Sequence, residues 1–392
     1  MTTEQLQDVA GWLQSHADEM TETLQRLVDC ESPSSDRDAL ARAFRLLAET
    51  LEGLDYEVLR LPGVRSGDHL EAHPRWGADT EDYQLLVGHM DTVWPLGTVD
   101  ERPATRAGDE LAGPGAFDMK GGLVQMLFAL RALRERDLAP AVAPVVLINS
   151  DEEVGSRESR PHLVRLAERA VRAFVLEPPF GAQGRLKTSR KGIGRFTVTI
   201  TGKASHAGLA PEAGVSAILE ASHQVQRLFE LNDPERGITV NVGTIDGGMG
   251  PNVVAPEVTA VVEVRVPTAR DGAEIEQALH GLTPVQEGAT VTVQGAFGRP
   301  PLEPTQRNVE LWDAARQAAD ELGFALSQAA VGGASDGNTT SLYTATLDGL
   351  GAVGAGAHAV DEHVVLTHMP QRAALLAALL MLPAPDPTAR TP

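Results

Sequence analysis

Three short apolar runs in this sequence each stop abruptly at histidine or acidic residues. With their polar ends they are YQLLVGHMD at 83–91, APVVLINSDEE at 143–153 and AFVLEPP at 173–179. Apolar runs of this length, rich in Val, Leu and Ile, are typical of buried strands. Helix-like patterns at 122–136 and 162–170 lie between them. This alternation predicts an α/β fold with a largely parallel central sheet.

The pattern changes near residue 186. From there the apolar spacing predicts elements in the order β-α-β-β-α-β, which is the order of a ferredoxin-like α+β domain. We place this domain at 186–297, as an insertion, so that 1–185 and 298–392 together form one main domain. A chain of 392 residues is long enough for two such domains. The main domain is expected to begin with helices at 4–29 and 36–52 and to end in a proline-rich tail that frays.

Charge and composition exclude several kinds of partner. The formal net charge of −21 argues against nucleic acid or an anionic membrane, because both need a basic surface. No apolar stretch approaches the ~20 residues that span a bilayer, and the N-terminus lacks the basic and apolar regions of a signal peptide. Cys30 is the only cysteine, which excludes an intrachain disulfide and a thiolate metal site. We therefore expect a cytoplasmic protein.

Histidine and acidic side chains are expected to gather at one edge of the main sheet, where the carboxyl ends of its strands meet. Taken singly, acidic residues after strands are turn formers or helix caps, and a loop histidine is simply exposed. Gathered together, carboxylates raise one another's pKa unless cations separate them. Mixed histidine and carboxylate ligands suit zinc, cobalt or manganese. The candidates are His89, Asp91, Asp118, Asp151, Glu152, Glu153, Glu177 and His358.

Five motifs in this order resemble the di-zinc exopeptidase family of glutamate carboxypeptidases, aminoacylases and succinyl-diaminopimelate desuccinylases. The motifs are GHMDTV at 88–93, GAFDMKGG at 115–122, DEEVGS at 151–156, EPP at 177–179 and GAHAVDEHV at 356–364. The insertion adds GKASHAG at 202–208 and EVRVP at 263–267. The resemblance covers nearly the whole chain, and the sequences of the motifs are most similar to those of glutamate carboxypeptidases. It implies a catalytic metal-binding domain with an inserted lid and dimerisation domain.

The resemblance also implies a ligand set for two zinc ions per chain, with Co²⁺ or Mn²⁺ as substitutes. Asp118 would bridge the two ions. His89 and Glu177 would complete the protein ligands of one ion, and Glu153 and His358 would complete those of the other.

Further residues in the motifs receive roles in the same way. The resemblance makes Glu152 the general base, which takes a proton from water between the metals and passes it to the leaving amine. Asp91 would fix the imidazole of His89, in a carboxylate–histidine–metal arrangement. A cis peptide bond is implied between Asp118 and Met119.

The resemblance places substrate contacts in the inserted domain. His206 would reach across a dimer interface and stabilise the oxyanion in the partner's site. Asn252 would donate to a substrate carbonyl, and Arg265 would bind the free carboxylate of the substrate. Without the resemblance, these are an exposed loop histidine, a turn residue and a residue on a surface strand.

Two loops remain open to alternative interpretations. The segment 184–192 has four basic residues and no acid. It is either a solvated linker or an attractor of an anionic substrate, with Arg185 in the position of the family's basic residue near the glutamate side chain. The loop 332–341 is expected to line the substrate pocket through Ser335, Asp336 and Asn338, although a turn-rich connection is the simpler interpretation.

Our hypothesis from the sequence is a di-zinc exopeptidase that removes a C-terminal residue, with glutamate as the leading candidate. The substrate would be a small peptide or an N-acyl amino acid, and the insertion would form a homodimer. An aminoacylase, a deacetylase or a desuccinylase would use the same chemistry with a different acyl pocket. A non-catalytic binding protein on this scaffold would lack Glu152 or a metal ligand, and none is missing. The sequence contains no phosphate-binding loop.

Overall fold

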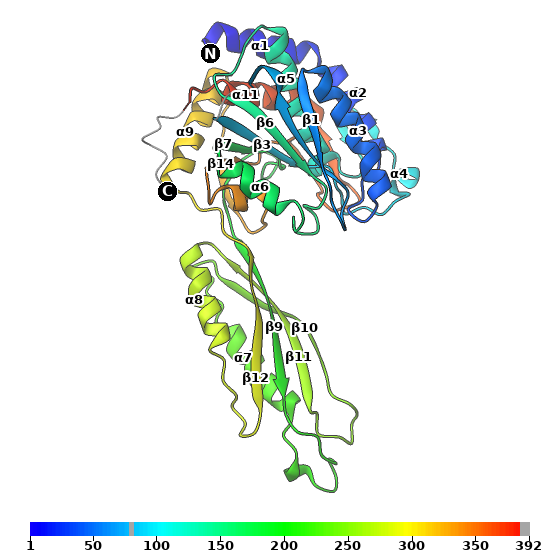
Figure 1. Ribbon diagram of the computed structural model, residues 1–392, viewed down its shortest axis with the longest axis vertical. Helices are drawn as coiled ribbons and strands as arrows, with labels where there is room; N and C mark the ends of the chain where they lie inside the picture. Colours follow the sequence, from blue (N-terminus) through cyan, green and yellow to red (C-terminus); the bar gives the residue numbers. More distant parts are fainter. Residues whose placement is uncertain (78–81, 385–392) are drawn as a thin grey trace. The chain divides into compact units, whose positions relative to one another are not determined.

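The chain folds into two compact units, each described here by itself (Figure 1). The computed structural model describes residues 1–77 and 82–384, so most of the proline-rich tail lies outside the described residues. Unit 1 comprises Met1–Thr188, Pro304–Ala330 and Ser335–Pro392, and unit 2 comprises Ser189–Glu303 and Val331–Ala334. The boundaries drawn from the sequence, 186 and 297, lie a few residues from these. The short segment 331–334 joins unit 2 through contacts such as the hydrogen bond from Arg265 to Gly332, which a sequence pattern does not reveal.

Unit 1 is built on an eight-stranded sheet with the order β1-β2-β6-β3-β7-β14-β8-β13. The four central strands β6, β3, β7 and β14 are parallel, as predicted, while the pairings β1–β2, β2–β6 and β14–β8 are antiparallel. The sheet is therefore mixed, with a parallel centre. The strands are β1 (Tyr56–Leu61), β2 (His69–Pro74), β3 (Tyr83–His89), β6 (Ala143–Asn149), β7 (Ala170–Val175), β8 (Leu186–Arg190), β13 (Gln328–Val331) and β14 (Ala345–Asp348).

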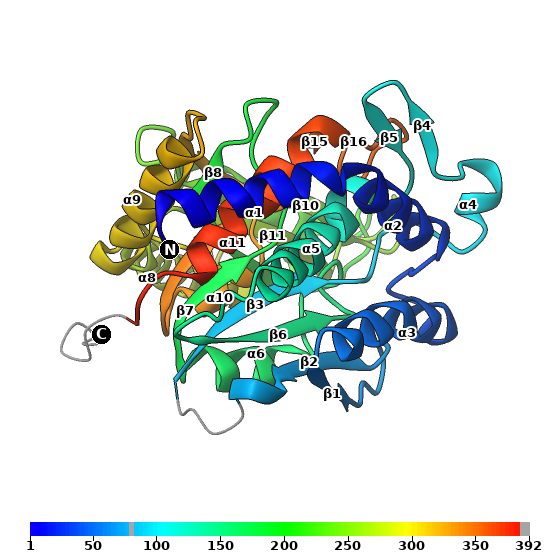
Figure 2. The same cartoon turned by 90° about the horizontal axis from the view of Figure 1, so that it is seen from above.

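The strands β3, β6 and β7 are buried along their whole length because helices cover both faces of the sheet (Figure 2). Leu86 and Val146 belong to the core beneath the larger group of helices, whereas Leu85 and Val145 pack against Leu163 of α6 on the opposite face. The larger group comprises α1 (Thr3–Ser15), α2 (Ala17–Asp29), α3 (Arg37–Gly53), α5 (Gly121–Glu135), α9 (Gln306–Glu321) and α11 (Met369–Leu380). The opposite face carries α6 (Arg160–Ala167) and the short α10 (Asp336–Thr340). Within the described ranges, none of these helices combines the length and apolarity that a membrane span requires.

The N-terminal helix predicted at 4–29 is in fact two helices that meet at His16. This residue ends α1 with φ −107° and ψ 15°, and α2 begins at the next residue. The His16 ring stacks on Trp12 at 3.8 Å, and its Nδ1 lies 2.8 Å from the Trp12 carbonyl oxygen. The prediction of one helix was wrong because apolar spacing continues across the break, while this local contact is not visible in the spacing.

A small second sheet in unit 1 carries the loops that end near the predicted metal ligands. It has the order β15-β16-β5-β4 and is antiparallel. Its strands are β4 (Thr105–Ala107), β5 (Glu110–Ala112), β15 (Gly354–Ala355) and β16 (His363–Val365). The loop between β15 and β16 contains His358, which this sheet thereby holds next to the helical turn η2 (Ala116–Lys120).

Unit 2 has the element order β-α-β-β-α-β, which confirms the ferredoxin-like prediction. Its antiparallel sheet has the order β10-β11-β9-β12. Phe196, Val198 and Ile200 of β9 point to one face and form a core with the two helices. The elements are β9 (Gly192–Thr201), α7 (Ala217–Glu230), β10 (Thr239–Gly247), β11 (Glu257–Val266), α8 (Ala269–His280) and β12 (Thr290–Arg299).

A carboxylate at the start of α6 should make the loop before β2 sensitive to acid. Glu158 accepts hydrogen bonds from the backbone N–H groups of Val64, Arg65 and Ser66 at 2.9–3.1 Å. Burial opposes ionisation of Glu158, but these hydrogen bonds outweigh it and lower its pKa to about 2. Because the folded-state pKa lies below the ordinary value, this stabilisation is complete above the ordinary pKa of Glu and is lost as the pH falls toward 2.

We therefore expect hydrogen-exchange protection factors of these three amides to stay constant from pH 7 to 5 and to fall between about pH 4 and 2. The Glu158→Gln variant should show low protection of the same amides throughout this range. Protection that is independent of pH in the unsubstituted protein would contradict the role of Glu158.

Candidate metal centre

The predicted ligands lie at the carboxyl edge of the parallel strands. β3 ends at His89, whose partner in the register of β6 is Asn149. The turn that contains Glu152 and Glu153 follows β6, and Glu177 follows β7, the neighbour of β3 on its other side. Three adjacent strands therefore bring these side chains to one place, as expected from the apolar runs in the sequence.

Asp118 lies between two histidine–glutamate pairs and presents one carboxylate oxygen to each. Its Oδ1 is 3.2 Å from His89 Nε2, and Glu177 Oε1 is 3.6 Å from the same nitrogen. Its Oδ2 is 3.6 Å from His358 Nε2, and Glu153 Oε2 is 3.0 Å from that nitrogen. The structure thus brings together all five residues of the ligand set implied by the resemblance, with Asp118 in the shared position.

The spacing of these atoms fits divalent cations. The ligand atoms of His89, Asp118 and Glu153 lie within 4.8 Å of one another, as do those of His89, Glu152 and Glu177. Metal–ligand bonds of about 2 Å place the atoms around one ion roughly 3–4 Å apart, so small side-chain adjustments suffice. Glu152 is thus as close to His89 and Glu177 as a ligand would be, and a metal count on a Glu152 variant distinguishes a ligand from a base.

The pKa values of the residues in this cluster also indicate that it favours bound cations. Burial lowers the pKa of His89, but its hydrogen bonds to Asp118, Asp91 and Glu177 outweigh this and raise the pKa well above its ordinary value. The hydrogen bond to Glu153 raises the pKa of His358 to about 9, although burial opposes it. Burial raises the pKa of Glu153 itself, against the effect of His358. Several carboxylates therefore converge on two imidazoles, and bound divalent cations would balance this concentration of negative charge.

Asp91 positions both the histidine and the acidic turn. It is fully buried, and its carbonyl oxygen lies 2.9 Å from His89 Nδ1, while its carboxylate oxygen Oδ1 is 3.5 Å from the same atom. The carboxylate accepts the backbone N–H groups of Glu152 and Glu153, both at 3.2 Å, and the hydroxyl of Ser34 at 2.7 Å. The sequence analysis predicted only that Asp91 orients the imidazole of His89. Asp91 also fixes the backbone of Glu152 and Glu153.

Replacing Asp91 with Asn should reduce metal affinity or kcat by roughly 10- to 100-fold. An amide keeps the shape but offers one acceptor oxygen instead of two, so a backbone N–H of the glutamate turn loses its partner. Isothermal titration of the metal-free protein with Zn²⁺, together with steady-state kinetics, measures both effects. Ser34→Ala is the matched control, because it removes one hydrogen bond to Asp91 and leaves the carboxylate; an Asp91→Asn variant no worse than this control would contradict the assignment.

A buried carboxylate that the sequence analysis missed holds the loop of Asp118. Glu362 is 2 % exposed and accepts the backbone N–H groups of Gly115, Phe117 and Asp118 at 2.9–3.1 Å, and the indole N–H of Trp94 at 2.9 Å. Its only signal in the sequence is its place in GAHAVDEHV, four residues after His358. The cis peptide bond implied between Asp118 and Met119 is present in this loop.

Three predicted substrate contacts are instead buried parts of the protein framework. Ser335, Asp336 and Asn338 are 0–3 % exposed. The Ser335 hydroxyl donates to Asp348 and caps α10, where Asn338 completes the capping box. Asp336 accepts the hydroxyl hydrogen of Ser156 at 2.6 Å. We correct the prediction, since these side chains have their partners inside unit 1 and no surface to offer a substrate.

The predicted substrate residues of unit 2 lie on its surface. His206 and Asn252 are exposed on adjoining loops, joined by the hydrogen bond from Ala207 N–H to the Asn252 carbonyl at 3.0 Å. The guanidinium of Arg265 contacts Glu263 at 2.9 Å and the Gly332 carbonyl oxygen at 2.8 Å. Their roles toward a substrate remain predictions.

A hollow of about 330 Å³ opens beside Asp118 in unit 1. Lys187 is the only cation on its wall among the described residues, and its Nζ lies 3.9 Å from Glu177 Oε2. Arg185, two residues earlier, stacks its guanidinium on Phe180 at 4.7 Å from the ring centre. The other lining residues are Phe117, Pro178, Pro179, Phe180, Gly181, Ala182, Gly354, Ala355 and Ala357. The basic segment is therefore partly built into unit 1, which the sequence analysis left open.

Histidine–carboxylate pairs that share an aspartate, at the carboxyl edge of an α/β sheet, define the class of metal-dependent hydrolases. Comparison with known proteins gives the family. Residues 85–382 match the family model described as Peptidase family M20/M25/M40, and the chain belongs to this family of metallopeptidases. The resemblance drawn from the motifs is confirmed.

Individual relatives agree with this assignment. Carboxypeptidase G2 of Pseudomonas sp. (strain RS-16) is 31 % identical over 371 residues, which cover 92 % of this chain and 88 % of that protein. The aminopeptidase PepT of Bacillus cereus has the same fold, with a TM-score of 0.78, 23 % identity and coverage of 93 % of this chain and 98 % of that chain. The YXEP protein of Bacillus subtilis, a dinuclear metal-binding peptidase from the M20 family, aligns with a TM-score of 0.72, 13 % identity and coverage of 94 % and 98 %.

Proposed function

We propose that this M20-family peptidase uses two divalent cations, zinc by preference, to hydrolyse the amide bond to a C-terminal amino acid. The observation that carries the proposal is the position of Asp118, with one oxygen toward His89 and the other toward His358. Two cations bound there would acidify a water molecule and polarise the scissile carbonyl group. His89 and Glu177 would hold one cation, and Glu153 and His358 the other.

Within this proposal Glu152 is the general base. Asp91 accepts the backbone N–H of both Glu152 and Glu153, so the turn is fixed while the two side chains are free to differ in direction. The Glu153 carboxylate meets His358, and a Glu152 oxygen lies within 4.8 Å of His89 and Glu177. Glu152 would accept the proton of the attacking water and donate it to the leaving amine.

An acidic C-terminal residue, with glutamate first, is the substrate side chain we propose. The hollow beside Asp118 has mostly apolar walls and the cation of Lys187, and Arg185 lies two residues earlier, directly before β8. A carboxylate that enters this hollow would find opposite charge. We further propose that Arg265 binds the terminal carboxylate, Asn252 a substrate carbonyl and His206 the oxyanion of the partner's site.

We also propose that the protein is a cytoplasmic homodimer joined through unit 2. In the described part of the sheet, the outer strand β10 pairs on one side only, with β11, and seven of its nine residues are exposed. Ile245 and the nearby Met249 are 57 % and 74 % exposed, so an apolar open edge is available for a second copy. Light scattering with the variant Ile245→Lys should show the dimer converted to monomer.

A substrate panel tests the proposed activity. The metal-loaded enzyme would be assayed with acetylglutamate, acetylalanine, acetylornithine, succinyl-diaminopimelate, folate and dipeptides that end in Glu or Ala. Preference for folate and the dipeptide ending in Glu supports a glutamate carboxypeptidase. Faster cleavage of simple N-acyl amino acids would assign the chain to the aminoacylases, or to the deacetylases and desuccinylases, with the same centre.

A further inference from the structure

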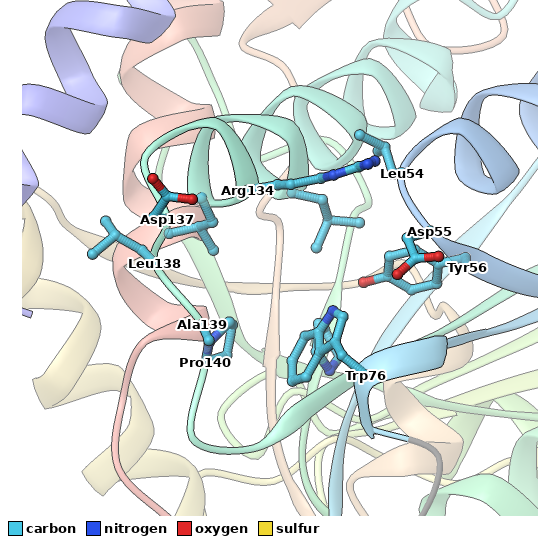
Figure 3. Close-up of a pocket in the computed structure, with 12 residues that line it drawn as sticks. Leu54, Asp55, Tyr56, Trp76, Arg134, Asp137, Leu138, Ala139 and Pro140 are labelled. Atoms are coloured by element: carbon cyan, nitrogen blue, oxygen red, sulfur yellow. The ribbon is translucent and has the colours of Figure 1, made fainter.

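A second cavity lies in unit 1 (Figure 3). Pro144 at the start of β6 lines it, whereas the metal centre lies beyond the other end of that strand. The cavity has a volume of about 380 Å³, within the range of small-molecule sites. β1 and β6 both begin at this cavity, and β6 runs seven residues, roughly 20 Å, to its metal-centre end. The lining residues are Leu54, Asp55, Tyr56, Trp76, Leu130, Leu133, Arg134, Asp137, Leu138, Ala139, Pro140 and Pro144.

Tyr56 brings a polar group into this cavity without a partner from the protein. Its side chain is buried, with 3 % of the residue exposed, and no described residue forms a hydrogen bond with its hydroxyl group. Figure 3 shows this hydroxyl pointing into the space between Trp76 and Arg134. Burial alone raises the pKa of Tyr56, so the group stays neutral. A ligand in the cavity can therefore offer this hydroxyl a hydrogen bond without displacing a partner from the described part of the protein.

The walls of the cavity favour a flat apolar group. Leu130, Leu133 and Pro140 line it, and the Trp76 ring stands at its mouth with 49 % of the residue exposed. A half-exposed indole next to leucine and proline side chains offers stacking area to an aromatic ring.

The charge around the cavity favours a cation on that ring. The helix α5 ends here, and the negative end of its dipole is followed by Asp137 in a left-handed conformation with φ 53°. The charged residues that line the cavity are two acids, Asp55 and Asp137, and one base, Arg134. Arg134 donates to the carbonyl oxygen of Gly53, and Arg75 lies 3.8 Å from Asp55. Figure 3 shows the Arg134 side chain extending toward Leu54, away from Asp137. The indole face of Trp76 adds attraction for a cation.

We propose that this cavity is a binding site for a small aromatic amine. Its ring packs between Trp76 and the leucine wall, a polar group on the ring hydrogen-bonds to the Tyr56 hydroxyl, and its ammonium group faces Asp137 and the end of α5. The site is separate from the metal centre and does not depend on the proposed peptidase activity.

Tryptamine is the probe, because it combines an indole ring, an N–H group and an ammonium group. In the metal-loaded full chain labelled with ¹⁵N-tryptophan, tryptamine should shift the indole signal of Trp76 with a dissociation constant on the order of 1 mM or tighter. The Trp94 signal, which reports on the loop of Asp118, should stay in place. Indole-3-propionate, of similar size but opposite charge, should bind at least about tenfold more weakly.

Matched variants separate the parts of the site. Tyr56→Phe should weaken tryptamine roughly three- to tenfold and leave 1-methyltryptamine, which lacks the indole N–H, unchanged. Asp137→Asn should weaken tryptamine but not 3-ethylindole. Tyr56→Phe should not lower Tm, because the hydroxyl has no partner among the described residues. Absence of a Trp76 shift at about 10 mM tryptamine, or equal binding of the anion, would overturn the proposal.

Discussion

Glu152→Gln should lower kcat of the metal-loaded enzyme by roughly 10²- to 10⁴-fold while two metal ions per chain remain bound. The amide keeps the size of the side chain and its backbone N–H bond to Asp91 Oδ1, so the turn after β6 keeps its conformation. What is lost is a group that can take a proton from water. Metal analysis and kinetics on the same sample measure the two halves of this expectation.

The neighbouring substitution Glu153→Gln is the control for this experiment. Glu153 contacts His358 at 3.0 Å and lies beside Asp118, so its loss should remove one of the two metal ions and activity together. If Glu152→Gln also lost a metal ion, Glu152 would be a ligand, as its distance from His89 and Glu177 allows, and the base would have to be sought elsewhere. Full activity in Glu152→Gln would refute the proposed mechanism.

The parts of the fold and site that the sequence predicts are those set by simple periodic or topological rules. A strand that is buried on both faces has a continuous apolar run, and the end of that run is the edge of the sheet. This rule locates His89, Glu153 and Glu177 from the sequence alone, and the strand ends confirm it. Their roles as ligands came from the resemblance.

The parts that the sequence does not predict depend on contacts between distant segments. The side chains of Asp336 and Glu362 are polar and lie in glycine-rich loops, so both were open to a role at the surface. One is buried against Ser156, 180 positions away, and the other against the backbone of Asp118, 244 positions away. The sequence also did not predict the antiparallel strands at the edges of the main sheet. The direction of a strand depends on the connection that leads to it, and apolar spacing carries no information on that connection.

The sharing of Asp118 leads to the second large expected effect, on metal stoichiometry. Asp118→Ala should leave neither metal ion bound at micromolar concentrations and should abolish activity, because each histidine–glutamate pair would retain two protein ligands instead of three. Glu177→Ala and His358→Ala each affect one pair only, and each should retain one ion. The unsubstituted protein should therefore bind two metal ions per chain, Glu177→Ala and His358→Ala one each, and Asp118→Ala none.

Stability provides an independent measure of the same assignment. A bound ion raises Tm through its affinity for the folded state, so Zn²⁺ should raise Tm of the unsubstituted protein and, less strongly, of the two single-pair variants. Asp118→Ala should show no such rise. Retention of one ion by Asp118→Ala would show that one pair is complete without the aspartate, and the bridging assignment would then be wrong.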